Sequence, residues 1–340
     1  MKNPRIITLV MLTLWVACEA PKSTVSEASE TQAPLSIPGL RARDYESTLT
    51  FEKEVMGDSV VSGDLYSYYS DSLKIYALVN TPSSEKPEDG YPVVIFGHGF
   101  HPEPKKYGVS TSLGVDWRPG DYYRGVPESY ARAGYLTVTP DYRGHNVSDG
   151  FQFTQSPFYS NYYTIDVLHL IKALSTLENI NSAKIYYVCH SLGGDVGLRA
   201  LLVTNKIKAA SLWSSVLGDI WQQSLFYGRL QEDNPGYVDN QQMKQFSSWY
   251  TDGAKNLPYP YDIESGDPSS FLEELKTPVI VQHALGDRSV PYLWSEGFVT
   301  KLYQLGKKFE LYAYEGNDHL FKGSVRAEAV ERDITFFKKY

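Results

Sequence analysis

The stretch VCHSLGG, residues 188–194, decides how the rest of the sequence is read. Ser191 follows the apolar run KIYYV and opens SLGGDVGLRALLV, which has the composition of a helix. So tight a strand-to-helix turn exposes its serine and favours small residues two positions to either side. Here these are Cys189 and Gly193, so the pattern departs from Gly-x-Ser-x-Gly at its first position. The stretch predicts a nucleophile elbow with Ser191 at its tip.

Short apolar runs alternate with helix-like segments along the chain on both sides of this turn. The helix-like segment TIDVLHLIKALSTL, residues 164–177, repeats its apolar side chains on one face. Strand and helix in regular alternation predict a parallel sheet covered on both faces, and three earlier runs predict antiparallel edge strands. The predicted strands are 47–55, 64–70, 73–81, 92–99, 135–143, 184–190, 209–216, 278–284 and 309–315.

A serine nucleophile needs a base and a carboxylate that orients the base. Asp287 lies just past the predicted strand 278–284, and His319 lies just past 309–315. Ligands of such sheets bind beyond the carboxyl ends of the strands, where both residues fall. We therefore predict a triad of Ser191, Asp287 and His319. The neighbour Asp318 is the rival acid, but adjacent residues rarely point at one another.

The tetrahedral intermediate of acyl transfer needs two amide donors for its oxyanion. The loop FGHGFHPEP follows the strand 92–99 and is predicted to supply one of them through the backbone N–H of Phe100. The second is the N–H of Leu192, directly after the nucleophile.

Five motifs together resemble the α/β-hydrolase superfamily: GHGFHP, DYRGHNVSDG, CHSLGG, GDRSVP and GNDHLF. The chain order Ser, Asp, His is that of the superfamily. Within it, residues 73–340 are similar to prolyl-oligopeptidase-like peptidases and dienelactone-hydrolase-like esterases. The resemblance implies an α/β-hydrolase fold, an acyl-enzyme mechanism and neither metal nor organic cofactor. Family peptidases carry a large N-terminal propeller, and only a short segment precedes the core here, so we expect a carboxylic ester hydrolase. A serine peptidase with the same residues is the alternative.

The segment 217–276 is far longer than a simple strand-to-helix connection and predicts a lid over the strand ends. Its aromatic residues could line an acyl or sugar pocket or simply pack the lid onto the body, and the sequence leaves both open. They are Trp221, Phe226, Tyr227, Trp249, Tyr250, Tyr259 and Tyr261.

The first residues predict export. Lys2 and Arg5 precede an apolar run that is long enough for a signal peptide and too short to span a membrane. The run ends in LWVAC, which resembles a bacterial lipobox with Cys18 as the acylated residue. Trp15 departs from that pattern, and an ordinary signal peptide is the alternative. We thus expect a signal peptide over 1–18, a flexible tether over 19–42, one hydrolase domain over 43–340, and a lipid anchor in the bacterial cell envelope.

Composition limits the partners. The chain is 42% hydrophobic and 21% charged, which describes a globular protein with a sizeable core. Its net charge of -8 becomes -10 without the leader's Lys2 and Arg5, so nucleic acid is a poor partner. Lipidation of Cys18 would leave Cys189 without a disulfide partner, because the chain has two cysteines. The expected partners are a small ester or acylated sugar and, through the lipid, a membrane. A lipoprotein that binds glycans or partners without catalysis is the remaining alternative.

Overall fold

The structure is a computed structural model that describes residues 34–57, 60–106, 123, 125–156, 158–233, 263–316 and 318–340. The elements in chain order are α1 (Ile37–Arg41), β1 (Thr50–Gly57), β2 (Val61–Ser70), β3 (Leu73–Pro82), β4 (Tyr91–Gly97), η2 (Pro104–Lys106), α2 (Pro127–Arg132), β5 (Leu136–Pro140), η4 (Phe151–Gln155), α3 (Tyr159–Ala173), η5 (Leu174–Thr176), β6 (Ile180–His190), α4 (Leu192–Val203), β7 (Ile207–Trp213), α5 (Ile220–Asp233), α7 (Ile263–Gly266), η7 (Pro268–Glu274), β8 (Val279–Ala284), α8 (Tyr292–Gln304), β9 (Phe309–Tyr314) and α9 (Gly323–Phe337).

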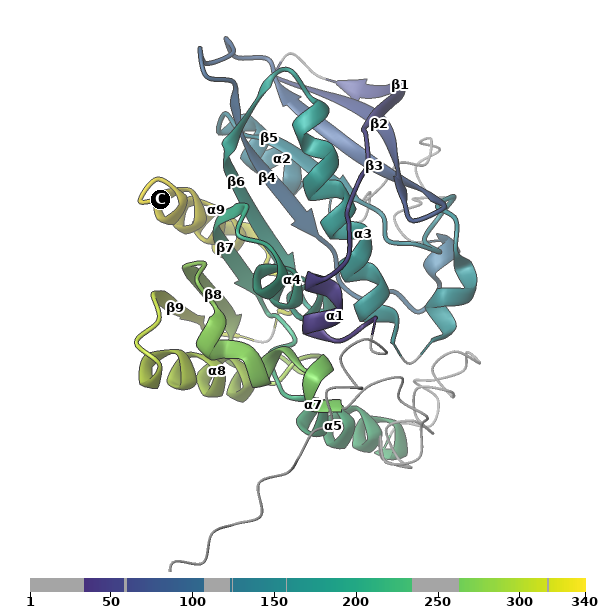
Figure 1. The fold of residues 1–340 in the computed structure, drawn as a ribbon. Helices are drawn as coiled ribbons and strands as arrows, with labels where there is room; N and C mark the ends of the chain where they lie inside the picture. Colours follow the sequence, from purple (N-terminus) through teal and green to yellow (C-terminus); the bar gives the residue numbers. More distant parts are fainter. Residues whose placement is uncertain are drawn as a thin grey trace, which may run out of the picture.

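The strands form one nine-stranded sheet in the order β1-β2-β3-β5-β4-β6-β7-β8-β9 (Figure 1). β1, β2 and β3 pair antiparallel, and β3 meets β5 antiparallel as well. From β5 to β9 every pairing is parallel. All nine predicted runs are strands, so the fold class expected from the sequence, an α/β-hydrolase fold with a mostly parallel sheet, is confirmed.

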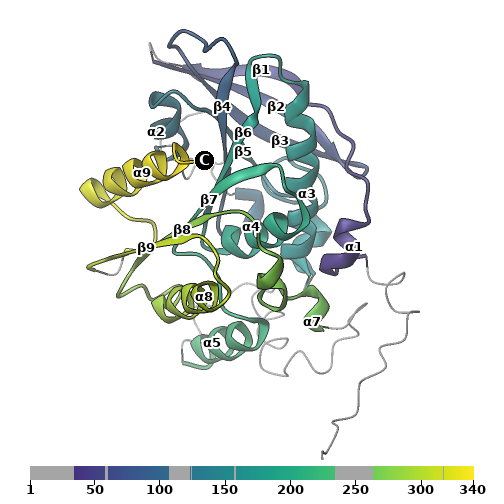
Figure 2. The same ribbon diagram turned by 60° about the vertical axis from the view of Figure 1, so that its left-hand side comes forward.

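Helices cover both faces of the sheet (Figure 2). α1, α3, α4 and α8 bury apolar residues on one face, in a core that includes Val167, Leu170 and Leu198. α2 and α9 cover the other face, where Tyr130, Phe336 and Phe337 join a second core. The central strands, such as β4, β5 and β8, are therefore buried on both sides, as a parallel sheet requires.

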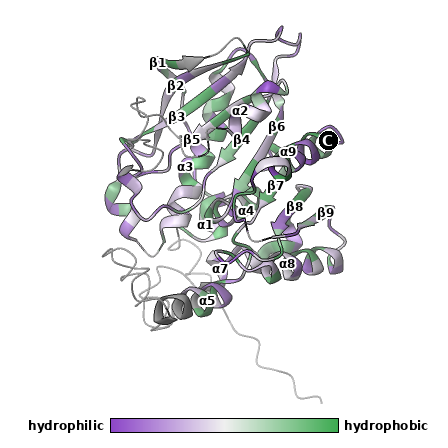
Figure 3. Ribbon diagram, turned by 180° about the vertical axis from the view of Figure 1, so that it is seen from behind, coloured by the Kyte–Doolittle hydropathy of each residue, from purple (hydrophilic) through white to green (hydrophobic). Residues whose placement is uncertain are grey.

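Hydropathy follows the same layering. Hydrophobic residues run along the strands in the middle of the sheet, and a covering helix such as α9 carries both hydrophobic (green) and hydrophilic (purple) residues (Figure 3). α9 buries Val330 and Phe336, whereas Glu331 points to solvent. Within the described part of the chain, no helix combines the length and apolar character needed to cross a membrane.

Helix α1 lies within the segment 19–42 that the composition predicts to be a tether. Ile37 and Leu40 are fully buried, and the Ser36 hydroxyl caps the helix by accepting the N–H of Gly39 at 3.0 Å. Arg41 donates to the carbonyl oxygen of Leu202 at the end of α4. The packed domain therefore begins before residue 43, because the end of this Pro- and Ser-rich segment carries Leu and Ile side chains that its first part lacks.

The predicted lid is described at its two ends only. α5 packs against α8, with the rings of Phe226 and Tyr227 5.4 and 5.8 Å from the ring of Trp294. η7 packs against α4. The signal segment with Cys18 and the lid residues Trp249, Tyr250, Tyr259 and Tyr261 lie outside the described residues.

Candidate active site

Ser191 occupies a strained turn between β6 and α4. Its backbone has φ 55° and ψ -122°, a conformation that residues other than glycine rarely adopt. Three hydrogen bonds hold it there. The backbone N–H of Ser191 donates to the backbone oxygen of Trp213 at 3.1 Å. The backbone carbonyl oxygen of Ser191 accepts the N–H groups of Gly194 and Val216 at 2.9 Å each. This is the geometry of a nucleophile elbow, and it presents the serine at the end of the sheet.

Close packing explains the small residues around the turn. A Cβ on Gly193 would lie 2.4 Å from the Gly97 carbonyl oxygen at the end of β4, so no larger residue fits. Cys189 takes the position where glycine is common, and its Sγ would lie 2.3 Å from a Cβ on Gly197. Glycine one turn into α4 thus makes room for the cysteine. Burial raises the pKa of the Cys189 thiol, which suits an inert packing group.

Asp287 and His319 come together beside this turn. His319 Nδ1 lies 2.7 Å from Asp287 Oδ2, although the two residues are 32 positions apart. The Asp287 side chain is fully buried, and that of His319 is 25% exposed. His190, the residue before Ser191, contacts the backbone oxygen of His319 at 2.9 Å, which brings the base loop against the elbow. The predicted base and acid are therefore in contact after β9 and β8, and the base loop lies against the elbow after β6 that carries Ser191.

The carboxylate of Asp287 is held in its charged form. Burial alone would raise its pKa, but hydrogen bonds from His283 and His319 and from backbone N–H groups lower the pKa below the usual value. Asp287 Oδ1 accepts the N–H groups of Ser289 at 2.8 Å and Val290 at 3.1 Å. A charged acid in this position fixes the tautomer of His319 with the proton on Nδ1, which frees Nε2 to act as a base.

The sequence did not single out His283 as part of the site. Its Nε2 lies 3.3 Å from Asp287 Oδ2 and 3.0 Å from the Val290 oxygen, and its Nδ1 lies 2.7 Å from Ser295 Oγ. A carbonyl oxygen only accepts, so Nε2 carries the proton, and in the neutral ring Nδ1 accepts the hydroxyl proton of Ser295. His283 lies inside β8, four residues before Asp287, and that spacing was the only signal that could have drawn attention to it.

Asp318 does not compete for the base. Its Oδ1 accepts the N–H of Leu320 at 3.2 Å, and its Oδ2 lies 3.3 Å from Lys322 Nζ near the surface. Two residues after His319, Phe321 is buried with φ 50°, and the centroid of its ring lies 5.3 Å from that of Trp213. The base loop is thus anchored in the second core directly after His319.

The predicted oxyanion donors lie on both sides of Ser191. Leu192 is the first residue of α4, so its N–H has no acceptor one turn earlier in the helix. Gly99 lies against the nucleophile, because a Cβ there would be 2.9 Å from Ser191 Cβ. The Gly99 N–H donates to the Tyr123 hydroxyl at 3.2 Å. Phe100 supplies the next amide of this loop, and its role stays a prediction.

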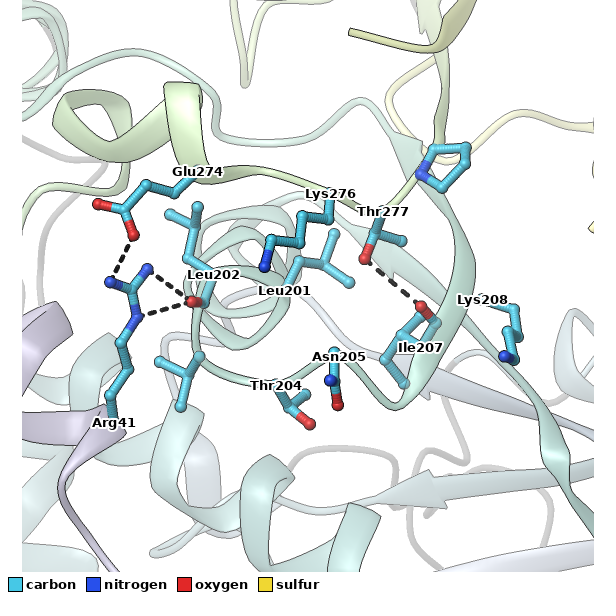
Figure 4. Close-up of a pocket in the computed structure, with 12 residues that line it drawn as sticks. Arg41, Leu201, Leu202, Thr204, Asn205, Ile207, Lys208, Glu274, Lys276 and Thr277 are labelled. Carbon is cyan, nitrogen blue, oxygen red and sulfur yellow. Dashed lines mark hydrogen bonds and ion pairs between the residues drawn. The ribbon is translucent and has the colours of Figure 1, made fainter.

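A separate cavity of about 730 Å³ lies at the other end of α4 (Figure 4). Arg41 lies on its rim, between the Glu274 carboxylate at 2.6 Å and the Leu202 carbonyl oxygen. None of the triad residues lines it. Because α4 has 12 residues, this cavity is about 18 Å from Ser191 and is not the active site. No cluster of metal-ligating side chains occurs among the residues described here.

The sequence model of the Prolyl oligopeptidase family matches residues 122–340. An acetyl xylan esterase from Paenibacillus sp. R4 superposes with a TM-score of 0.61 at 16% identity, over 89% of this chain and 92% of the esterase. No curated protein matches the sequence.

Two peptidases superpose as well. Porphyromonas gingivalis dipeptidyl peptidase 4 gives a TM-score of 0.55 at 17% identity, over 87% of this chain and 36% of the peptidase. An acylaminoacyl peptidase, solved in complex with a chloromethyl ketone, gives 0.61 at 20% identity, over 82% and 41%. The chain thus spans well under half the length of either peptidase. At these identities the likenesses establish the fold alone.

Proposed function

The chain belongs to the prolyl oligopeptidase family and is a serine hydrolase, and from this premise we propose that it cleaves carboxylic esters through an acyl-enzyme. The observation that carries the mechanism is the 2.7 Å contact of His319 with a buried, charged Asp287 beside the strained Ser191. A serine hydroxyl is a poor nucleophile until a base takes its proton, and this arrangement provides that base.

The proposed reaction runs in two halves. Ser191 Oγ attacks the ester carbonyl carbon while His319 Nε2 takes the hydroxyl proton, and the imidazolium is stabilised by Asp287. The amides of Phe100 and Leu192 stabilise the oxyanion. The intermediate collapses, the C–O bond to the alcohol breaks, and His319 returns its proton to the leaving alkoxide. A water molecule then attacks the acyl group with His319 again as base, which releases the acid and restores Ser191.

Three considerations support an ester over an amide. An alkoxide leaves with little help, whereas an amide needs its nitrogen protonated and its bond twisted by contacts along a peptide. The superposition on the acetyl xylan esterase extends over nearly all of both chains. In addition, the described residues before β4 form α1 and three strands of the same sheet, so this described part of the chain belongs to the hydrolase domain and does not form a separate gating domain. We infer that the substrate is a short-chain aryl ester or an acylated sugar.

A peptidase is the second candidate, because the matched family is that of prolyl oligopeptidase and two superposed structures are peptidases. A screen of kcat/KM on p-nitrophenyl acetate, acetylated sugars and prolyl anilides separates the two. We expect the esters to be cleaved faster by at least about a hundredfold, since catalysis of amide cleavage asks more of substrate contacts. An anilide that outperforms every ester replaces the ester assignment with the peptidase one.

A fluorophosphonate probe tests the nucleophile directly. It should label wild-type protein and the exposed-serine control Ser175→Ala, and it should not label Ser191→Ala. Labelling that persists in Ser191→Ala moves the nucleophile elsewhere. A folded wild type that is neither labelled nor active would support the binding lipoprotein instead.

We further propose that Cys18 is lipidated and anchors the enzyme in the cell envelope, as the lipobox resemblance of LWVAC suggests. The test compares Cys18→Ser with the wild type after membrane fractionation of the expressing bacterium. The wild type should stay with the membranes and the variant should leave them. Equal partition of the two proteins contradicts the anchor.

A further inference from the structure

His190, the residue directly before the nucleophile, is buried and bridges two loops of the site. Its Nε2 lies 2.9 Å from the backbone oxygen of His319. Its Nδ1 lies 2.7 Å from the Tyr123 hydroxyl, which in turn accepts the N–H of Gly99 at 3.2 Å. The chain of contacts therefore runs from the loop after β4 through the elbow to the loop after β9.

Chemistry fixes the direction of every hydrogen bond in this bridge. The carbonyl oxygen of His319 only accepts, so the His190 proton is on Nε2. Burial, followed by the nearby His319 side chain, lowers the pKa of His190 to about 3, so the ring is neutral and Nδ1 accepts. Tyr123 then donates its hydroxyl proton to Nδ1, and its oxygen is the acceptor for Gly99. All four groups are satisfied in one arrangement.

We propose that His190 and Tyr123 are positioning residues that hold the base loop and the oxyanion loop in register around Ser191. Neither is expected to touch the reacting atoms. The inference rests on the serine-hydrolase reaction proposed above and is independent of the choice between ester and amide.

The bridge acts where small displacements matter. His319 is fixed at two points, by Asp287 through its side chain and by His190 through its backbone oxygen. Gly99 lies against Ser191, so the loop that carries the Phe100 amide is tied to the same bridge through Tyr123. Misplacement of a reacting group by about 1 Å can cost roughly a hundredfold in rate. A shift of either loop would therefore reduce turnover and leave substrate binding nearly unchanged.

Two amide substitutions of His190 separate the halves of the bridge. In His190→Gln the amide can put an N–H where Nε2 stood, which keeps the donor for the His319 oxygen. In His190→Asn the shorter amide can put its oxygen where Nδ1 stood, which keeps the acceptor for Tyr123 but loses the donor. Both variants replace the ring by a smaller amide, so a purely steric role affects them alike. Tyr123→Phe removes the hydroxyl that joins His190 to Gly99.

We expect His190→Asn to lower kcat about a hundredfold, with KM within about threefold of wild type. His190→Gln should recover at least about tenfold of that loss, and Tyr123→Phe should lower kcat by about tenfold to a hundredfold. The matched controls are His169→Asn and His169→Gln, on buried His169 of α3, and Tyr135→Phe, whose ring packs on Tyr186. All three controls should keep wild-type kcat.

The outcomes are distinguishable. If His190→Asn and His190→Gln both retain wild-type kcat, or if both lose it to the same extent, the positioning role is overturned while the hydrolase assignment stands. If the folded wild type neither reacts with a fluorophosphonate nor hydrolyses any substrate, the serine-hydrolase assignment fails and the positioning role fails with it. Melting temperatures of all variants show whether a loss of kcat follows a loss of stability.

Discussion

Two buried carboxylates in this protein lie in opposite electrostatic surroundings, and the first is Asp287 in the turn after β8. Two imidazoles contact its Oδ2, His319 at 2.7 Å and His283 at 3.3 Å. Two backbone N–H groups, from Ser289 and Val290, donate to its Oδ1. These donors outweigh the effect of burial, and the pKa of Asp287 lies below the usual range.

The second is Asp333 of α9, buried where this helix covers β7 and β8. Its Oδ2 accepts the Tyr130 hydroxyl at 2.6 Å and the Trp213 indole N–H at 2.9 Å, and its Oδ1 accepts the Gln282 amide at 2.6 Å. These partners are all neutral. Burial is the largest influence and raises the pKa of Asp333 to about 7, although the hydrogen bonds act against it.

The difference shows that burial alone does not make a catalytic carboxylate. Both side chains are removed from water, and both have a full set of donors. Only Asp287 contacts imidazole rings and backbone amides that favour its charge, and only there does a partner, His319, reach toward solvent. Asp333 instead joins α9 to the end of β7, where it accepts the indole N–H of Trp213. The backbone oxygen of Trp213 in turn accepts the N–H of Ser191. We therefore propose that Asp287 acts in catalysis and that Asp333 stabilises the fold.

The largest expected effect is on activity. Asp287→Asn should lower kcat roughly ten-thousandfold, because an amide in this position favours the wrong tautomer of His319. The kcat of Asp333→Asn should stay within about threefold of wild type, and so should that of Asp318→Asn, at the residue before His319. Neither carboxylate contacts the His319 ring. Steady-state hydrolysis of p-nitrophenyl acetate provides the measurement. If Asp318→Asn lowered kcat as much as Asp287→Asn does, the choice of Asp287 over Asp318 as the acid would be wrong.

The next effect is on stability. Asp333→Ala leaves the Tyr130 hydroxyl, the Trp213 indole N–H and the Gln282 amide without their shared acceptor, which should lower the free energy of unfolding by about 2–4 kcal/mol. Glu331→Ala, an exposed site on the same helix, should change it by less than about 0.5 kcal/mol. Urea denaturation at pH 6 measures both. Equal stability of the two variants would mean that the Asp333 network contributes nothing to the fold.

The contrast between the two carboxylates also shows which features of the fold and the site could be predicted from the sequence. Regular alternation of apolar runs predicted all nine strands, and strand-end positions singled out Asp287 and His319, because these signals are local. Asp333 sits in an amphipathic helix 120 positions from Trp213, so nothing nearby in the sequence reveals its partners. His190 and His283 look like ordinary residues at a strand end and within a strand. Their partners come from separate loops and turns that only the folded chain brings together.

The smallest effect concerns the pH dependence of stability, and here the two carboxylates should act with opposite sign. The folded pKa of Asp333, about 7, exceeds its ordinary value of 3.8, so between these values the folded state holds more protons than the unfolded state. Its contribution is fully present below about pH 4 and is lost as the pH rises toward 7, with a limiting slope of about 1.4 kcal/mol per pH unit. Asp287, whose pKa is lowered, contributes stability above pH 4 that is lost as the pH falls below it.

Subtraction isolates the contribution of Asp333, because its donors Tyr130, Trp213 and Gln282 carry no charge in the pH range of the measurement. Between pH 4.5 and 7.5 the unfolding free energy of wild type minus that of Asp333→Asn should fall as the pH rises. The same difference for Asp287→Asn should instead rise with the pH below about pH 4, where that carboxylate titrates in the unfolded chain. Any constant cost of the amide shifts a curve without changing its slope. A flat difference for Asp333→Asn between pH 4.5 and 7.5 would mean that Asp333 is ionised in the fold like Asp287, and that its neutral donors stabilise a charge as well as the two histidines do.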